Sequence, residues 1–202
     1  GVMSEYLPDG TELTGTGWAL QNPKDYIDVL KYIIPEAVAQ SGVSSKDIIG
    51  IGLDFTSCTM LPVDENNVPL CLLVKNVSRP HAWVKLWKHH GAQKQADEIN
   101  ELLKKRGEID NIQFGGKISS ELLLPKILQI VEEDPELYDE AASFLEVGDW
   151  LTQILTNGRK RSGNLAGYKA MWTPETGYPS KDFLLQLSPK LENLTEDKLG
   201  DD

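Results

Sequence analysis

The chain has 202 residues, of which 40% are hydrophobic and 25% are charged, and these proportions are those of an ordinary globular protein. It carries 20 Lys and Arg residues against 31 Asp and Glu residues, which gives a formal net charge of -11. This acidity argues against nucleic acid or an anionic membrane as a partner, because both surfaces would repel the chain.

The N-terminal part of the chain predicts a loop and then a helix. Residues 1–20 are rich in Gly, Thr and Pro and predict a loop or part of a hairpin. A helix is expected to begin at Asn22-Pro23, a capping residue followed by a proline, and to end at Ser41-Gly42. Pro35 lies inside this pattern and is expected to kink the helix or divide it in two.

The next segments predict strands. Residues 48–55 are a short, nearly continuous apolar run, which is typical of a strand buried on both faces of a sheet. Residues 59–63 and 69–73 flank a polar turn and predict a hairpin. Because a helix precedes the buried strand, the pattern indicates an α/β fold.

The remaining chain predicts mainly helices. Periodicity and stop signals place one from Trp83 to Gly107, one from Ser119 to Val131, and one from Pro135 to Asn157. The tail from Asp182 is acidic and weakly helical. No repeat or linker is evident, so we expect one domain with a large helical portion.

Targeting and redox features favour a cytoplasmic protein. No apolar run approaches the length of about 20 residues that spans a bilayer, and the first residues do not have the pattern of a signal peptide. Cys58 and Cys71 are too few for a disulfide framework, and no other metal-ligating residues accompany them in the sequence. We therefore expect two buried, reduced thiols.

Two polar or aromatic clusters in the first half of the chain are candidate sites. Residues 54–59 follow the predicted strand, where ligands bind in open α/β sheets, but a plain polar loop capped by Asp54 is an equally good interpretation. In residues 81–90, Trp83 and Trp87 are one helical turn apart and are expected to share a face. Such a pair is more often core, yet an indole beside Lys and His also suits a sugar. A metal site at His89-His90 is disfavoured, because helical neighbours point apart and no third ligand follows.

Two further clusters lie in the second half. The glycines of residues 114–121 could cradle an anion, but the segment lacks the spacing of a phosphate-binding Walker loop, and a helix start capped by serine is favoured. Residues 162–172 contain flexible glycines, aromatic residues and Lys169, a composition that suits a polyol or phosphate pocket. The competing interpretation is a solvent-exposed lysine on a structural turn.

These clusters, taken in order, resemble one family. Residues 50–62, 83–90, 115–121 and 166–172 are similar to motifs of the FGGY carbohydrate kinases, in particular their ribulokinase branch. The resemblance implies two actin-like domains of the ribonuclease H type with the active site between them. It further implies that residues 1–202 are a partial N-terminal, sugar-side domain, truncated at its first strands and at the D-x-G-T-x-S phosphate loop. The C-terminal domain, which carries the catalytic aspartate and most of the ATP site, would be absent.

The resemblance also implies a function. The full-length protein would transfer the γ-phosphate of ATP, with Mg²⁺, to L-ribulose in arabinose breakdown. Trp87 and Lys169 would contact the sugar, and Asp54, Ser57 and Cys58 would lie in the loop beneath it. No residue of this chain is assigned as the catalytic base, and both ATP and Mg²⁺ would bind mostly elsewhere, so the isolated chain is expected to be inactive.

Two alternatives to a kinase are open to different degrees. One is a non-enzymatic sugar-binding or scaffold module derived from an actin-like half. The other is a ribonuclease H-like nuclease, which is disfavoured because it needs clustered carboxylates for two metal ions and a surface that tolerates nucleic acid. The sequence leaves the oligomeric state open, a homo-oligomer included, and does not decide which pentulose is preferred.

Overall fold

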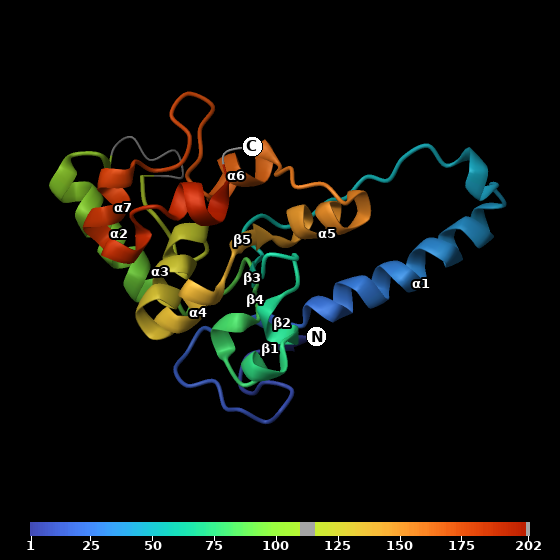
Figure 1. Cartoon of the computed structure of the whole chain (residues 1–202), viewed down its shortest axis with the longest axis horizontal. Coiled ribbons are helices and arrows are strands. Elements are labelled where there is room, and N and C mark those ends of the chain that lie inside the picture. Colours follow the sequence, from blue (N-terminus) through green and yellow to red (C-terminus); the bar gives the residue numbers. More distant parts are fainter. Residues whose placement is uncertain (110–115, 201–202) are drawn as a thin grey trace.

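The computed structural model describes residues 1–109 and 116–200 (Figure 1). Its centre is a five-stranded antiparallel sheet in the order β1-β2-β4-β3-β5. These strands are β1 (Val2–Met3), β2 (Leu20–Gln21), β3 (Met60–Val63), β4 (Val84–Lys85) and β5 (Ser143–Glu146). In the register, Met60 is paired with Lys85 on one side and with Glu146 on the other, so β3 joins the two strands that lead into the candidate site. The expected α/β class is confirmed.

The helices lie on both sides of this small sheet. They are α1 (Pro23–Ser41), α2 (Gln93–Arg106), α3 (Leu123–Glu133), α4 (Pro135–Glu140), α5 (Val147–Thr156), α6 (Gly163–Lys169) and α7 (Lys181–Leu187). Helices α2, α3, α4 and α7 gather on one side, whereas α1 extends away from the fold as an arm (Figure 1). Within residues 1–109 and 116–200, no helix has the length and apolar character needed to cross a membrane.

The local signals at the N-terminus predict the structure well. Strands β1 and β2 form the expected hairpin-like pairing. Helix α1 begins where predicted, because the Asn22 side chain accepts a hydrogen bond from the Lys24 N–H, and it ends at Gly42 in the left-handed conformation with φ 68°. Pro35 lies inside one unbroken helix, so the expected division is wrong, while the alternative, a kink, stays a prediction. Since Pro23 is the one buried residue of α1, water can reach the carbonyl that Pro35 leaves without a partner.

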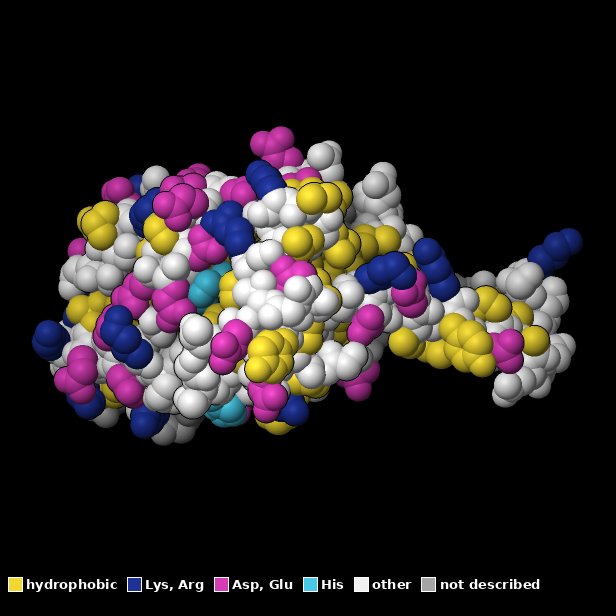
Figure 2. Space-filling view, turned by 90° about the horizontal axis from the view of Figure 1, so that it is seen from below, with side chains coloured by type: hydrophobic (Ala, Val, Ile, Leu, Met, Phe, Trp, Pro, Cys, Tyr) yellow, Lys and Arg dark blue, Asp and Glu magenta, His cyan; other side chains and the backbone are white. Residues whose placement is uncertain are grey.

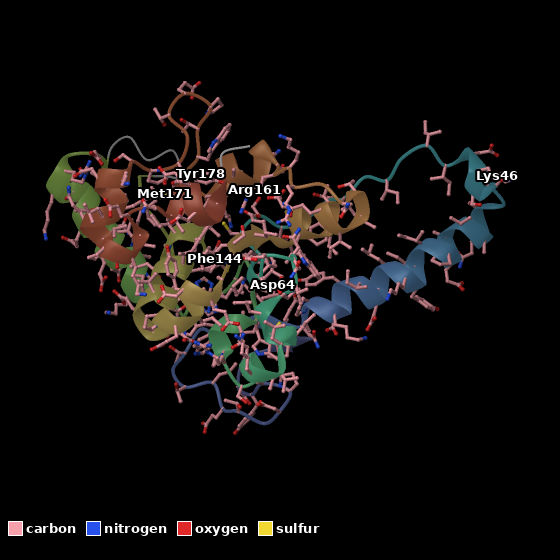
Figure 3. The ribbon with its side chains drawn as sticks, in the orientation of Figure 1. Lys46, Asp64, Phe144, Arg161, Met171 and Tyr178 are labelled. Atoms are coloured by element: carbon pink, nitrogen blue, oxygen red, sulfur yellow. The ribbon has the colours of Figure 1, made fainter. Side chains whose placement is uncertain are left out.

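The arm formed by α1 and the segment after it carries exposed apolar side chains among charged ones. Figure 2 shows hydrophobic side chains along it, and Figure 3 places Lys46 at its far end. The predicted buried strand over residues 48–55 is wrong: these residues form no strand, and Ile49 and Ile51 are exposed. An apolar run becomes a strand only where a neighbour pairs its backbone, and among the described residues none pairs this one.

Tertiary pairing also changes the predicted hairpin and helices. Strand β3 is confirmed, but residues 70–72 form a short helical turn joined to it by a single bridge between Val63 and Pro69. The helix expected from Trp83 begins only at Gln93, because residues 84–85 pair with both β2 and β3. The helix expected over residues 135–157 is divided by β5, which pairs with β3 along its whole length. Strand pairing at the centre of the sheet therefore overrides local helical periodicity.

The core lies between the sheet and α3. Residues 123–131 of α3 are all buried, and Phe144 of β5 is buried at the centre of the fold (Figure 3). The serine-capped start expected for α3 is wrong, since the helix begins at Leu123 and the Ser119 hydroxyl accepts a hydrogen bond from the Glu121 N–H in the turn before it. Of the paired glycines considered as an anion cradle, Gly115 lies outside the described residues. Residues 163–169, expected as a loop, form α6.

Candidate functional site

Two of the predicted site residues, distant in sequence, come together in the fold. Trp87 follows β4, and Lys169 is the last residue of α6. The Lys169 Nζ lies 5.7 Å from the centroid of the Trp87 ring, within the range of a cation–π contact. The Trp87 residue is 38% exposed and the Lys169 side chain 20% exposed, so both groups can meet a ligand.

A carboxylate that the sequence reasoning did not assign completes this contact. The Lys169 Nζ is 3.0 Å from Glu121 Oε2, in the turn that precedes α3. On the other side of the carboxylate, His90 Nε2 is 3.8 Å from Glu121 Oε1. The ion pair holds the lysine stem beside the indole. Glu121 stands in a segment already noted for its glycines and serines, but nothing in its spacing pointed to Lys169.

The two tryptophans of the 81–90 segment do not share a face, contrary to the prediction. Trp83 is only 4% exposed and belongs to the core, where its indole Nε1 donates to the Val77 carbonyl at 3.1 Å. The reason is that this segment is a strand and a turn rather than a helix. His89 is also buried, with Nε2 3.0 Å from Gln129 Oε1. In the part of the chain that the structure describes, no group of three or more His, Cys, Asp or Glu residues could hold a metal ion.

Cys58 is held in the interior directly beneath Lys169. Its thiol donates to the Lys169 carbonyl at 3.3 Å, and its backbone N–H donates to Glu146 Oε2 at 2.7 Å. Its carbonyl accepts from Lys126 Nζ at 2.6 Å. Burial raises the pKa of the Cys58 thiol far above its usual range, so the thiol stays protonated. Its predicted contact with the sugar stays a prediction.

The pKa values of two charged groups around Cys58 are shifted by burial. Lys126 and Glu146 are both buried. Burial lowers the pKa of Lys126 to about 8, against the smaller opposing effect of the Glu146 carboxylate. Burial raises the pKa of Glu146 to about 7, although the hydrogen bond from the Cys58 N–H acts in the other direction. Sequence reasoning assigned neither residue to the site.

The other two predicted residues line a neighbouring cavity. Asp54 is exposed and Ser57 is half-buried, and both border a cavity of about 550 Å³ between residues 51–57 and helices α5 and α6. Asp149 borders the same cavity, and its Oδ1 accepts from the Ser162 N–H at 2.8 Å. Burial raises the pKa of Asp149. The predicted residues therefore form two adjoining groups, which meet along the chain at residues 57–58.

Comparison with known proteins gives consistent matches. The sequence profile of the N-terminal domain of the FGGY family of carbohydrate kinases matches residues 2–167. A ribulokinase from Bacillus licheniformis is 50% identical over 202 residues, covering 100% of this chain and 37% of the relative. A ribulokinase from Geobacillus thermodenitrificans is 50% identical over 199 residues, covering 98% of this chain and 35% of the relative. The chain thus spans little more than a third of the length of these curated relatives.

Solved structures of sugar kinases share the fold. A ligand-bound xylulose kinase from Lactobacillus acidophilus superimposes with a TM-score of 0.66 at 15% identity, covering 95% of this chain and 34% of that one. A gluconate kinase from the same organism gives a TM-score of 0.63 at 16% identity, covering 92% of this chain and 34% of that one. At such low identity, these likenesses establish the fold alone.

Proposed function

The chain belongs to the FGGY family of carbohydrate kinases, and we propose that it forms the sugar-binding side of an enzyme that transfers the γ-phosphate of ATP to L-ribulose. The observation that carries this proposal is the meeting of Trp87 and Lys169 at 5.7 Å from two distant segments. An indole face packs against the C–H face of a sugar, and an ammonium donates hydrogen bonds to hydroxyl groups. The relatives named ribulokinase support the choice of ribulose as the sugar.

The arrangement of charges suits binding of a neutral polyol. Glu121 lies 3.0 Å from Lys169, so the two side chains offset each other's charge. A sugar hydroxyl can accept from the ammonium and donate to the carboxylate at the same time, so the ion pair offers both kinds of partner. The carboxylate also fixes where the ammonium stands relative to the indole, which orients the bound sugar. Asp54 and Ser57 would contact its other end from the adjoining cavity.

ATP and Mg²⁺ are proposed to bind mostly outside this chain. Magnesium is usually held by one or two carboxylates together with substrate phosphates, so its site would lie with that of ATP. When bound, ATP supplies the phosphoryl group. We assign no catalytic base here, and we expect this chain alone to be inactive. The two free, buried cysteines are consistent with a reducing, cytoplasmic setting.

A coupled assay of ADP release tests the proposal. The full-length kinase that contains this chain is expected to release ADP in the presence of L-ribulose, and D-ribulose and D-xylulose serve as comparison sugars. The purified 202-residue chain is the matched control and should release none above buffer. Sugar binding by the full-length protein without any sugar-dependent ADP release would contradict the kinase proposal and favour a non-enzymatic sugar-binding module.

A further inference from the structure

We propose that Lys126 of α3 is a positioning residue of the sugar site, because its ammonium fixes the backbone of the two segments that carry Cys58 and Trp87. The inference rests on the proposed function. The Lys126 side chain is fully buried, and its Nζ donates to the Cys58 carbonyl at 2.6 Å and to the Leu86 carbonyl at 2.8 Å. One ammonium thus ties together two loops that approach the site from different strands.

The first of these loops is held in a conformation that needs support. Cys58 has a φ of 64°, in the left-handed region that residues with a β-carbon rarely adopt. Lys126 holds its carbonyl and Glu146 holds its N–H at 2.7 Å, so the residue is fixed from both ends. The thiol in turn reaches the Lys169 carbonyl at 3.3 Å. The position of the end of α6 therefore depends on how Cys58 is held.

The second loop carries the indole. The Leu86 N–H donates to the Ala19 carbonyl at 2.9 Å, and its carbonyl accepts from Lys126. The next backbone N–H, that of Trp87, donates to Thr59 Oγ1 at 3.3 Å. The backbone at Trp87 is thus anchored on both sides while its ring stays partly exposed. Loss of the Lys126 ammonium would release one anchor of each loop: the Cys58 carbonyl would lose its donor, and the Leu86 carbonyl would keep only the His89 N–H at 3.0 Å.

The charge of Lys126 agrees with this role. A buried ammonium is stable only where its N–H groups meet acceptors, and here the acceptors are the two loop carbonyls. Glu146 is the nearby buried carboxylate, and its interaction with Lys126 favours the charged form of each group. The titratable groups that act on the charge of Lys126 include Cys58, Glu146, Lys169 and Glu121. Cys58 and Lys169 are proposed residues of the site, and Glu121 forms the ion pair with Lys169.

Steady-state kinetics of the full-length kinase test the inference with three variants. Lys126→Met keeps the apolar stem of the side chain as far as Cε and removes its donors, and we expect it to raise the KM for L-ribulose about tenfold while the KM for ATP stays within about twofold. Lys126→Gln retains two N–H donors on a side chain shorter by one atom, and we expect an intermediate sugar KM. Lys85→Met is the matched control, because Lys85 is equally buried but its Nζ faces His81 at 3.0 Å and the Trp18 ring.

The control separates positioning from general stability. We expect Lys85→Met to lower the thermal midpoint but to leave both KM values within about twofold of the parent. A sugar KM of Lys126→Met at the parent value, or an equal rise in Lys85→Met, would overturn the inference. If Lys126→Met does not fold, Lys126→Gln decides in the same way: a raised sugar KM supports the role and a parent value overturns it. A parent enzyme that releases no ADP with any sugar would instead overturn the proposed function, so the two failures are distinct.

Discussion

Replacement of Trp87 by alanine should weaken use of the sugar much more than it weakens the fold. The indole is already 38% exposed, so folding buries only part of its surface. The complex of the variant with the sugar would lack a stacking face, the cation–π contact with Lys169 at 5.7 Å, and an N–H donor. We expect the change in full-length kinase to lower kcat/KM for L-ribulose and to leave the KM for ATP close to that of the parent.

The magnitude follows from the contacts that are lost. A cation–π contact at a partly exposed site contributes about 0.5–1 kcal/mol, and a hydrogen bond from the indole contributes about 1 kcal/mol. Together with the lost stacking surface, the expected loss is about 1–3 kcal/mol, or roughly ten- to a hundredfold in kcat/KM for the sugar. Trp83→Ala is the matched control. Because Trp83 is 4% exposed, its removal should cost about 3–5 kcal/mol of unfolding free energy.

The assay compares both variants on three quantities: the thermal midpoint, the KM for L-ribulose and the KM for ATP. Trp87→Ala should move mainly the sugar KM, whereas Trp83→Ala should move mainly the midpoint. If Trp87→Ala lowers the midpoint as much as Trp83→Ala and retains the sugar KM of the parent, Trp87 is a core residue and the assignment to the site is wrong. An equal rise of both KM values would also contradict the reasoning.

Three further predictions concern the charged groups around Trp87. Lys169→Met keeps the bulk of the stem and should raise the KM for L-ribulose about tenfold with little loss of stability; unchanged kcat and KM would remove the lysine from the site. Glu121→Gln should raise that KM by roughly two- to tenfold, because Lys169 loses the charge that holds it at 3.0 Å; a parent value in the same kinetic assay would show that the ion pair does not orient the lysine. The third concerns the pH dependence of stability at Glu146. The pKa of its carboxyl is about 7 in the folded chain, against the ordinary 4.5. Between pH 4.5 and pH 7 the folded chain therefore binds more protons than the unfolded chain. The unfolding free energy should therefore fall, by up to about 3 kcal/mol, as the pH rises through this window, and urea unfolding of Glu146→Gln should lack that slope; an identical slope in the variant would contradict the assignment.

The parts of the fold that could be predicted from the sequence depend on short-range chemistry. The start of α1 follows from the Asn22 side chain, and the ends of α1, α2 and α5 follow from Gly42, Gly107 and Asn157, which all adopt the left-handed conformation. These signals act within a few residues, so they are visible in one segment of sequence. The order of the predicted elements, a helix followed by strands, also indicated the mixture of helix and strand.

The parts that could not be predicted depend on partners far along the chain. Residues 84–85 and 143–146 have helical periodicity, but each meets β3 across the sheet and becomes a strand. Residues 48–55 have the composition of a buried strand, but no described strand pairs with them. In each case the backbone takes the structure that satisfies its hydrogen bonds in the folded chain, and local propensity decides only where no such partner competes.

The candidate site shows the same division. Trp87 and Lys169 followed from the family resemblance, whereas Glu121, Lys126 and Glu146 were missed because Lys and Glu usually belong to the solvated face of a helix.

For Lys126 a signal was nevertheless present. It stands inside the run Leu122–Leu128, whose other members are all apolar, and such a run is too long to be one face of an amphipathic helix. A charge within it has to be buried, and a buried ammonium needs acceptors. Because the backbone carbonyls of regular helices and strands are already paired, the acceptors available to it are those of irregular loops, and the loops packed against α3 at this point are the ones that carry Cys58 and Trp87.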